Sequence, residues 1–284
     1  MDIHCFVHSR FEEAEKVKVR ERVCRDLPPE FFEDGHHFCV LHAPVTSKRQ
    51  KFWVVLEDRL ENLQFDLRAV YFPDCFVRRG RGFQADLDLS YAFFEEGADF
   101  SVGYFMGEAD LSHIESCGNF DISESTYLRQ AFFTGAKFQL DAIFHHSEFE
   151  RTVDLSGIYV GRNATFYQSR MRGYADLHDA VFSGDAEFDY TWFLSRADLT
   201  GVEFKKAAGF LETSFAHAHF RQAKFHAAAD FRSSYFKNQL DFRNAAFAEG
   251  ATFDYAKFAL SQPEILDGFS DLSKITFTDA DFDL

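Results

Sequence analysis

The cysteines near the amino terminus are the side chains best suited to chemistry in this sequence. Cys5-Phe-Val-His8 and Cys39-Val-Leu-His42 share a two-residue gap that lets neighbouring side chains bind one metal ion, and Cys24 lies between them. Three thiolates and one imidazole are a ligand set of closed structural zinc sites. We therefore predict a zinc site of Cys5, Cys24, Cys39 and His42, which would stabilise a segment too small for its own core.

A second interpretation of these residues stays open. The gaps of 19 and 15 residues between the cysteines are loose for a zinc motif, so the thiols could simply be buried and His42 a loop histidine. A disulfide framework is not expected, because the five cysteines are an odd number in a chain that opens without an export signal. Cys117 follows the repeat described below and is expected to face inward.

Catalytic motifs are missing from the sequence. It has no glycine-rich phosphate loop, no Gly-x-Ser-x-Gly elbow and no His-Glu-x-x-His motif. The best histidine clusters are His145-His146 and the group His217, His219 and His226, which have no obvious nucleophile partner. We expect a protein that is not an enzyme.

Composition and charge narrow the class of protein. The 284 residues include 38 phenylalanines but only 5 prolines, and the net charge is -16. Such a charge repels nucleic acid and anionic membranes. The chain contains no run of about 18 apolar residues, and its opening residues reach charged side chains before any apolar stretch develops. These features favour a cytoplasmic protein without direct nucleic-acid or membrane binding.

The phenylalanines are spaced alternately five and six residues apart. One register runs every 11 residues from Phe83 to Phe215, the other from Leu89 to Phe210, and only Ser116 among the 25 positions is not sizeable and apolar. Small residues usually precede these positions by two. After Phe215, two consecutive steps of five shift the register once. This period fits neither a helix nor a strand, so each segment must turn a corner, which predicts an all-β solenoid.

Runs such as 174-YADLHDAVFSGDAEF-188 and 196-RADLTGVEF-204 resemble pentapeptide repeats, and the resemblance covers about residues 65–258. It implies a right-handed quadrilateral parallel β-helix with one repeat on each face, and the alternating steps resemble the Phe-rich variant. Coils of 22 residues would give eight coils from 83 to 258, or about 38 Å of rod. A β-sandwich is the alternative, but sandwiches do not keep an 11-residue register over such a length.

The ends of the chain lack this repeat. We expect residues 1–64 to form a helical amino-terminal cap with helices near 11–27 and 51–63, residues 65–258 the β-helix, and residues 259–284 a carboxy-terminal cap. The second helix would cover the solenoid end with one face, made of Phe52, Trp53, Val55, Leu56, Leu60 and Leu63. Some bacterial pentapeptide-repeat proteins open with a segment similar to the Cys…Cys…Cys-x-x-His one here.

One column of acidic residues is predicted on the rod. Its members share a 22-residue spacing that only Phe132 interrupts: Asp88, Asp110, Asp154, Asp176 and Asp198. They could bind backbone at the corners and keep a Phe-rich rod soluble. Alternatively, the resemblance implies a DNA mimic, because some pentapeptide-repeat proteins are acidic rods that occupy the DNA site of type II topoisomerases such as DNA gyrase.

Aromatic residues form a second candidate surface. Tyr104, Tyr159 and Trp192, together with Phe93, are expected at outward positions in one column, where they could contact a protein partner or cover neighbouring coils. The sequence thus favours a non-enzymatic scaffold for protein–protein interaction, with a DNA mimic acting on a type II topoisomerase as the alternative. It leaves the partner and the oligomeric state open.

Overall fold

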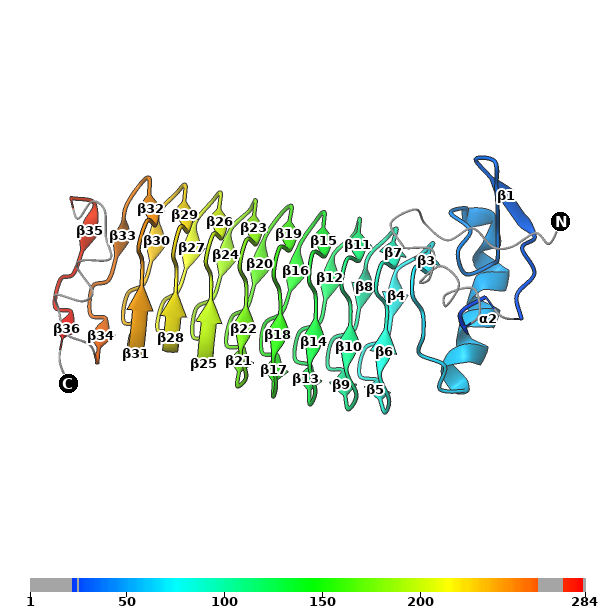
Figure 1. Cartoon of the computed structure of the whole chain (residues 1–284), viewed down its shortest axis with the longest axis horizontal. Coiled ribbons are helices and arrows are strands. Elements are labelled where there is room, and N and C mark those ends of the chain that lie inside the picture. Colours follow the sequence, from blue (N-terminus) through cyan, green and yellow to red (C-terminus); the bar gives the residue numbers. More distant parts are fainter. Residues whose placement is uncertain (1–21, 25, 260–272, 283–284) are drawn as a thin grey trace.

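The computed structural model describes residues 22–24, 26–259 and 273–282. It is a rod of stacked coils with a helix-containing cap at its amino-terminal end (Figure 1). Each coil contains four short strands, and the equivalent strands of successive coils pair in parallel. The predicted four-faced parallel β-solenoid is confirmed, and the nine strands stacked on one face correspond to about 43 Å of rod.

We number the faces in chain order from β5. Face 1, at the bottom edge of Figure 1, contains β5 (Gly82–Phe83), β9 (Tyr104–Phe105), β13 (Thr126–Tyr127), β17 (Glu148–Phe149), β21 (Arg170–Met171), β34 (Lys257–Phe258) and β36 (Asp281–Phe282). Face 2 contains β6 (Leu87–Asp88), β10 (Ala109–Asp110), β14 (Ala131–Phe132), β18 (Val153–Asp154) and β22 (Ala175–Asp176). Three longer strands run across both faces: β25 (Trp192–Asp198), β28 (Ser214–His219) and β31 (Tyr235–Asp241).

The other two faces are separate sheets. Face 3 contains β3 (Tyr71–Phe72), β7 (Phe93–Phe94), β11 (Glu115–Ser116), β15 (Lys137–Phe138), β19 (Tyr159–Val160), β23 (Val181–Phe182), β26 (Glu203–Phe204), β29 (Lys224–Phe225) and β32 (Ala246–Phe247). Face 4 contains β4 (Phe76–Val77), β8 (Ala98–Asp99), β12 (Phe120–Asp121), β16 (Ala142–Ile143), β20 (Ala164–Thr165), β24 (Ala186–Glu187), β27 (Ala208–Gly209), β30 (Ala229–Asp230), β33 (Ala251–Thr252) and β35 (Ile275–Thr276).

Two kinds of corner explain the alternating steps. Strands β5, β6, β7 and β8 start at residues 82, 87, 93 and 98, so five-residue and six-residue steps alternate. The longer corners contain one residue in the left-handed region, such as Tyr91 at φ 60° and Val102 at φ 58°. In the first of these turns, the Ala92 N–H donates to the Leu89 carbonyl at 2.9 Å. The extra residue of the six-residue step is therefore what closes every second corner.

The predicted register shift after Phe215 is confirmed in the long strands. Phe193 pairs with Phe215, but Arg196 pairs with His217, so β28 has one residue fewer at the corner between faces 1 and 2. From this point the coils resume the same four-face pattern. A solenoid tolerates this deletion because each coil contacts only its neighbours.

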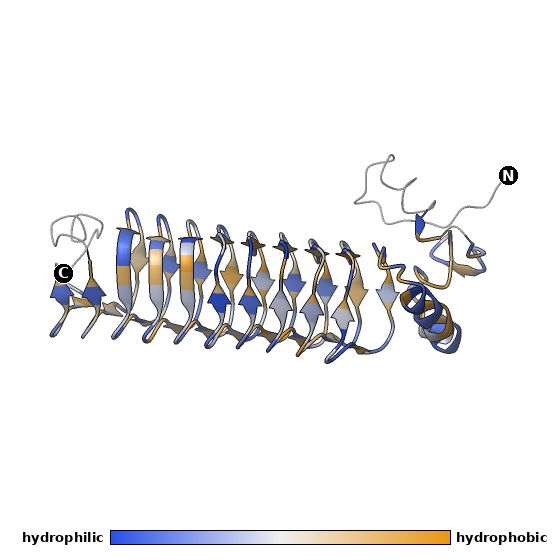
Figure 2. Cartoon of the chain, turned by 90° about the horizontal axis from the view of Figure 1, so that it is seen from below, coloured by the Kyte–Doolittle hydropathy of each residue, from blue (hydrophilic) through white to orange (hydrophobic). Residues whose placement is uncertain are grey.

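Stacked phenylalanines form the core of the rod. Equivalent rings of successive coils lie nearly parallel, with centroids 4.9 Å apart for Phe193 and Phe215 and 4.6 Å apart for Phe231 and Phe253. These side chains are buried, so each contributes about 1.5–3 kcal/mol of burial free energy. Figure 2 shows hydrophobic and hydrophilic residues interspersed along the whole rod. In strands such as β6 and β7, one residue is buried and its neighbour is more exposed.

The cap closes the amino-terminal end of this core. It contains a hairpin of β1 (Phe31–Glu33) and β2 (His36–Phe38), a short 3-10 helix η1 (Thr46–Lys48) and helix α2 (Arg49–Glu61). In α2, Phe52 packs edge-on against Phe72 of the first coil at 5.6 Å, and Trp53 stacks on Phe76. The helix predicted at residues 11–27 lies mostly outside the described residues.

Four other residues of the predicted covering face have different environments. Leu56 is buried, and Val55 and Leu60 pack partly buried against the core. The prediction for Leu63 was wrong, because this side chain is exposed. Leu63 follows the end of α2 in a left-handed conformation at φ 56°, which takes it off the helical face.

A buried lysine ties the cap to the first coil. Lys48 Nζ donates to the carbonyl oxygens of Leu41 at 3.0 Å and Tyr71 at 2.7 Å, and it lies 4.6 Å from the Phe52 ring centroid. The Tyr71 N–H in turn donates to the Leu41 carbonyl at 2.9 Å. The cap is thus hydrogen-bonded to the first strand of face 3.

At the other end, β35 and β36 continue faces 4 and 1 by parallel pairing with β33 and β34. The region predicted as a carboxy-terminal cap therefore includes part of one more coil. No helix in the described ranges is long and apolar enough to cross a membrane.

Candidate metal centre and interaction faces

Three of the four predicted zinc ligands lie together in the cap. The Sγ atoms of Cys24 and Cys39 are 3.8 Å apart, and His42 Nδ1 lies 3.2 Å and 3.1 Å from them, respectively. All three side chains are buried. Two thiolates bound to tetrahedral zinc at about 2.3 Å are themselves about 3.8 Å apart, so the sulfur separation fits this metal. Cys5 lies outside the described residues.

The imidazole of His42 is oriented for metal binding. Its Nε2 lies 3.1 Å from the Arg68 carbonyl oxygen, which only accepts, so Nε2 is the donor and the Nδ1 lone pair faces the two sulfurs. A tight turn, in which the Cys39 carbonyl accepts the His42 and Ala43 N–H groups, places Cys39 and His42 on the same side. The donor set and its hydrogen-bonded support therefore fit a structural zinc ion.

The remaining described cysteines do not join this cluster. Cys75 and Cys117 are both exposed on the rod, so the prediction that Cys117 faces inward was wrong. Cys117 directly follows the inward-facing Ser116, and successive residues of a strand point to opposite sides.

The structure places the predicted acidic residues in one column on face 2. Asp88, Asp110, Asp154, Asp176 and Asp198 occupy equivalent strand positions, and Phe132 interrupts them as expected. Each carboxylate accepts the N–H of the residue two positions later, for example Ser156 to Asp154 at 2.9 Å and Thr200 to Asp198 at 3.1 Å. These carboxylates hydrogen-bond the backbone of the corners.

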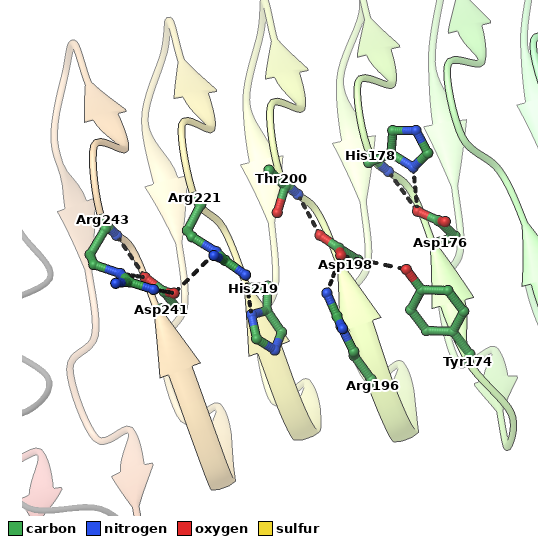
Figure 3. Close-up of polar contacts among 10 residues, drawn as sticks. All are labelled: Tyr174, Asp176, His178, Arg196, Asp198, Thr200, His219, Arg221, Asp241 and Arg243. Atoms are coloured by element: carbon green, nitrogen blue, oxygen red, sulfur yellow. Dashed lines mark hydrogen bonds and ion pairs between the residues drawn. The ribbon is translucent and has the colours of Figure 1, made fainter.

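Cations lie beside much of this column. Arg196 lies 2.5 Å from Asp198, and Arg221 and Arg243 lie 3.2 Å and 2.7 Å from Asp241 (Figure 3). Burial would raise the pKa of Asp241, but hydrogen bonds from Arg243 and its charge outweigh burial and lower that pKa. The carboxylates at this end of face 2 are thus partly neutralised.

His219 replaces an aspartate in the same column, between Asp198 and Asp241. Burial, together with the nearby Arg196 charge, lowers the pKa of His219. A neutral imidazole at this position adds no positive charge of its own and removes one carboxylate from the acidic column.

The predicted aromatic column is not one surface. Tyr104 and Trp192 lie on face 1, whereas Phe93 and Tyr159 lie on face 3. That prediction was wrong because only residues separated by whole coils share a face, and Tyr159 lies two and a half coils from Tyr104. Phe93 instead stacks on Tyr71 of the preceding coil, with centroids 5.0 Å apart.

Face 1 carries two exposed apolar patches. Tyr104 and Met106 are 42% and 43% exposed at β9, and Trp192 and Leu194 are 38% and 48% exposed at β25. Sequence reasoning missed Met106 and Leu194. Each lies two residues after an exposed aromatic residue and directly after an inward phenylalanine. Because both occupy the same position in their coils, the 22-residue spacing could have identified them as outward residues of one face.

Charged residues separate the two patches. Arg172 Nη2 donates to Glu148 at 2.7 Å and its Nε approaches Glu150 at 2.9 Å, while Arg170 lies 3.4 Å from Glu148. The Arg170 guanidinium also lies over the Trp192 ring, 4.5 Å from its centroid. Face 1 therefore presents apolar, charged and apolar surface in sequence along the rod.

Comparison with known proteins agrees with the repeat. A family model described as pentapeptide repeats (9 copies) matches residues 166–214, and the strand-and-corner pattern of this segment continues in both directions. No curated protein and no solved structure matches the chain. Residues 166–214 are thus identified as pentapeptide repeats, and the Phe-rich coils on either side of this segment follow the same pattern.

Proposed function

We propose that the protein is a non-catalytic scaffold that binds a protein partner through face 1. The distribution of exposed apolar side chains carries this proposal. Ten large hydrophobic side chains are exposed in the described residues, of which Tyr104, Met106, Trp192 and Leu194 lie on face 1 and Val102 and Tyr255 at the corner leading into it. The other four are spread over the cap and face 4.

The chemistry of face 1 resembles that of protein interfaces. Tyrosine, tryptophan, methionine and arginine are enriched at interface centres, and all four occur here. The patches at β9 and β25 are four coils apart, about 19 Å, which is within the reach of one interface of ordinary size. We expect a partner with two apolar sites that flank a charged region.

Paired variants test this proposal. A face 1 variant carries Tyr104→Ser, Met106→Ser, Trp192→Ser and Leu194→Ser, and a control carries Tyr159→Ser on face 3 and Val77→Ser on face 4. Wild type and control should capture the same protein from lysate of the source cells, and the face 1 variant about tenfold less of it. Capture should persist at about 0.5 M salt. Equal capture by both variants, with unchanged circular dichroism, would contradict the proposal.

Mimicry of DNA remains the alternative, and a supercoiling assay with DNA gyrase separates it from the scaffold. The scaffold proposal predicts no inhibition at large excess of the protein. The test variant is Asp154→Asn, Asp176→Asn and Asp198→Asn, since asparagine keeps the oxygen that accepts the corner N–H while losing the charge. Stoichiometric inhibition that fades with salt and is lost in this variant would establish mimicry.

We also propose that Cys24, Cys39 and His42 hold a structural zinc ion, with Cys5 as the fourth ligand. The buried cluster and the Arg68 contact of His42 support this proposal. A bound zinc would supply no reaction in this role. It would cross-link the segments around residues 24 and 39–42 and so stabilise the cap.

Metal content tests the zinc proposal. Protein purified without chelator should contain about one zinc per chain, and Cys39→Ser and Cys5→Ser should each remove most of it, whereas Cys117→Ser should not. A chelator should lower the melting temperature of the wild type but not of Cys39→Ser. Metal-free wild type, or a Cys24–Cys39 disulfide found by mass spectrometry, would overturn the proposal.

A further inference from the structure

A cavity of about 250 Å³ lies where the cap meets the first coils. Phe38 and Pro44 line it from the cap, and Tyr71, Tyr91, Phe93 and Glu115 line it from the rod. This cavity is on the side of face 3 and its neighbouring corner, away from the apolar patches of face 1. It is therefore separate from the face 1 patches, and it borders the Cys24, Cys39 and His42 cluster through His42.

The rings in this cavity are held in place by the solenoid. Tyr71 stacks on Phe93 with an interplanar angle of 12°, and Tyr91 stacks on His113 with centroids 4.7 Å apart. The Tyr71 hydroxyl donates to Glu95 at 2.7 Å, which fixes this ring further. Since stacking and hydrogen bonding already order these side chains, a ligand would lose little entropy in ordering them.

The charge of the lining favours a cation. The described lining has one carboxylate, Glu115, and two imidazoles, His42 and His113, but neither lysine nor arginine. Aromatic rings attract cations through their quadrupoles, and desolvated sites do so most strongly. One ring of the lining, Tyr71, already contacts an ammonium group, because Lys48 Nζ lies 5.0 Å from its centroid.

We propose that this cavity binds an organic ammonium group, with its methyl groups against Tyr91 and Phe93 and its charge facing Glu115. A quaternary ammonium suits the cavity better than a hard cation such as Ca²⁺ or Mg²⁺, because the rings and Pro44 offer apolar contact and Glu115 is the one carboxylate in the described lining, beside the imidazoles of His42 and His113. An anion would meet Glu115 unfavourably, and a neutral aliphatic group would leave the carboxylate unused. The site does not depend on the scaffold function of face 1.

A titration of the full chain with choline, followed by ligand-observed NMR, tests this proposal. Its neutral carbon isostere 3,3-dimethylbutan-1-ol has the same shape, and we expect choline to bind at least about tenfold more tightly. Glu115→Gln and Tyr91→Leu should each weaken choline binding about tenfold. Tyr190→Leu, at a left-handed corner residue far from the cavity, should leave it unchanged.

Three results would overturn the proposal: equal binding of choline and its isostere, unchanged choline binding by Glu115→Gln, or no saturable binding.

Trimethyllysine and tetramethylammonium, titrated in the same way, identify the source of the ammonium. Preference for trimethyllysine would indicate a modified protein, whereas equal binding of all three would support recognition of the head group alone. A protein that binds choline but captures no partner would contradict the face 1 proposal and leave the ammonium proposal standing.

Discussion

At Ser116 and Phe120 the usual side-chain sizes of the repeat are reversed. Ser116 is small where the repeat has a large residue, and Phe120 is large where the repeat has a small one. Ser116 occupies an inward position between Phe94 and Phe138, where the neighbouring coils have phenylalanine. Phe120, at a position that mostly holds alanine on face 4, places its ring 5.7 Å from Phe94 and 5.0 Å from Phe138. The large side chain of this coil thus comes from the adjacent face and fills the same volume.

This exchange predicts strong coupling between the two residues. Phe120→Ala should destabilise the protein by about 3–5 kcal/mol through a cavity, and Ser116→Phe by about 1–3 kcal/mol through overpacking. The double variant restores the usual arrangement and should be clearly more stable than the sum of the two changes predicts. Urea unfolding of the four proteins measures this coupling. Additive effects would mean that the two side chains do not share one space.

Asp88 and Asp198 occupy equivalent positions but differ in their surroundings. Burial raises the pKa of Asp88 to about 6, against the effects of Ser90 and Arg68. Burial acts in the same direction on Asp198, but hydrogen bonds from Thr200 and Arg196 outweigh it and lower that pKa. The Asp88 contribution to stability is therefore present below about pH 4 and lost as the pH rises through 6, whereas that of Asp198 is lost as the pH falls through its lowered pKa.

Asparagine substitutions should consequently have opposite effects at pH 7. Asp88→Asn keeps the acceptor for Ser90 and should stabilise the protein by about 1 kcal/mol after solvent screening, a gain that shrinks towards pH 4. Asp198→Asn should destabilise the protein at pH 7. Urea unfolding between pH 4 and 7 tests both changes, and effects of the same sign at pH 7 would contradict this account.

The corners between faces 4 and 1 share a row of buried hydroxyl groups. Each hydroxyl donates to a carbonyl oxygen of the preceding coil, as Ser169 does to Phe144 at 2.6 Å and Thr213 to Phe188 at 2.7 Å. The other donors are Ser125, Ser147, Thr191 and Ser234. The Phe188 carbonyl also accepts the Thr191 N–H, so the hydroxyl provides its second hydrogen bond. These corners are therefore tied to the coil before them by side chains as well as by backbone.

Thr213→Val removes one of these hydrogen bonds without changing the shape of the side chain. We expect a loss of about 1 kcal/mol, because the buried carbonyl loses a partner. Thr126→Val, on the outer side of face 1, should change stability by less than about 0.5 kcal/mol. Thermal unfolding of both variants measures the difference, and equal effects would show that the buried hydroxyl contributes nothing.

The sequence predicts the coils far better than their outer surface, for a physical reason. An inward side chain such as Phe215 must match the coil above and below, so its period is visible, and even the shortened corner after it can be recognised. Outward residues have no such constraint. The 11-residue period also combines alternate faces, which is why Tyr159 was grouped with Trp192. The position of Leu63 depends on how the helix ends, and no repeat encodes it.

The zinc cluster was partly predictable for a different reason. The two-residue gap between Cys39 and His42 is a local feature that the turn preserves, whereas the approach of Cys24 depends on how the cap folds. Nothing in the sequence indicates that the Arg68 carbonyl orients His42, because that contact joins the cap to the first coil and depends on how the two pack together. Local spacing thus predicts a ligand pair, and tertiary contact completes the site.

At the scale of the whole molecule, the faces of the rod differ in their surface chemistry. Its interior is filled by phenylalanine, face 2 uses acidic residues at its corners, and face 1 exposes apolar side chains at two places along its length. A rigid rod of this kind holds the patches at β9 and β25 at a fixed distance from one another. This fixed spacing is the property that a scaffold binding through face 1 requires.

Photo-crosslinking in the source cells tests binding through face 1 most directly. A photoreactive phenylalanine analogue replaces Met106 or Leu194 on face 1, and Tyr159 on face 3 as the matched control. We predict that positions 106 and 194 crosslink to the same protein, and that position 159 does not. Crosslinking of that protein equally from position 159, or no crosslink from either face 1 position, would contradict the account.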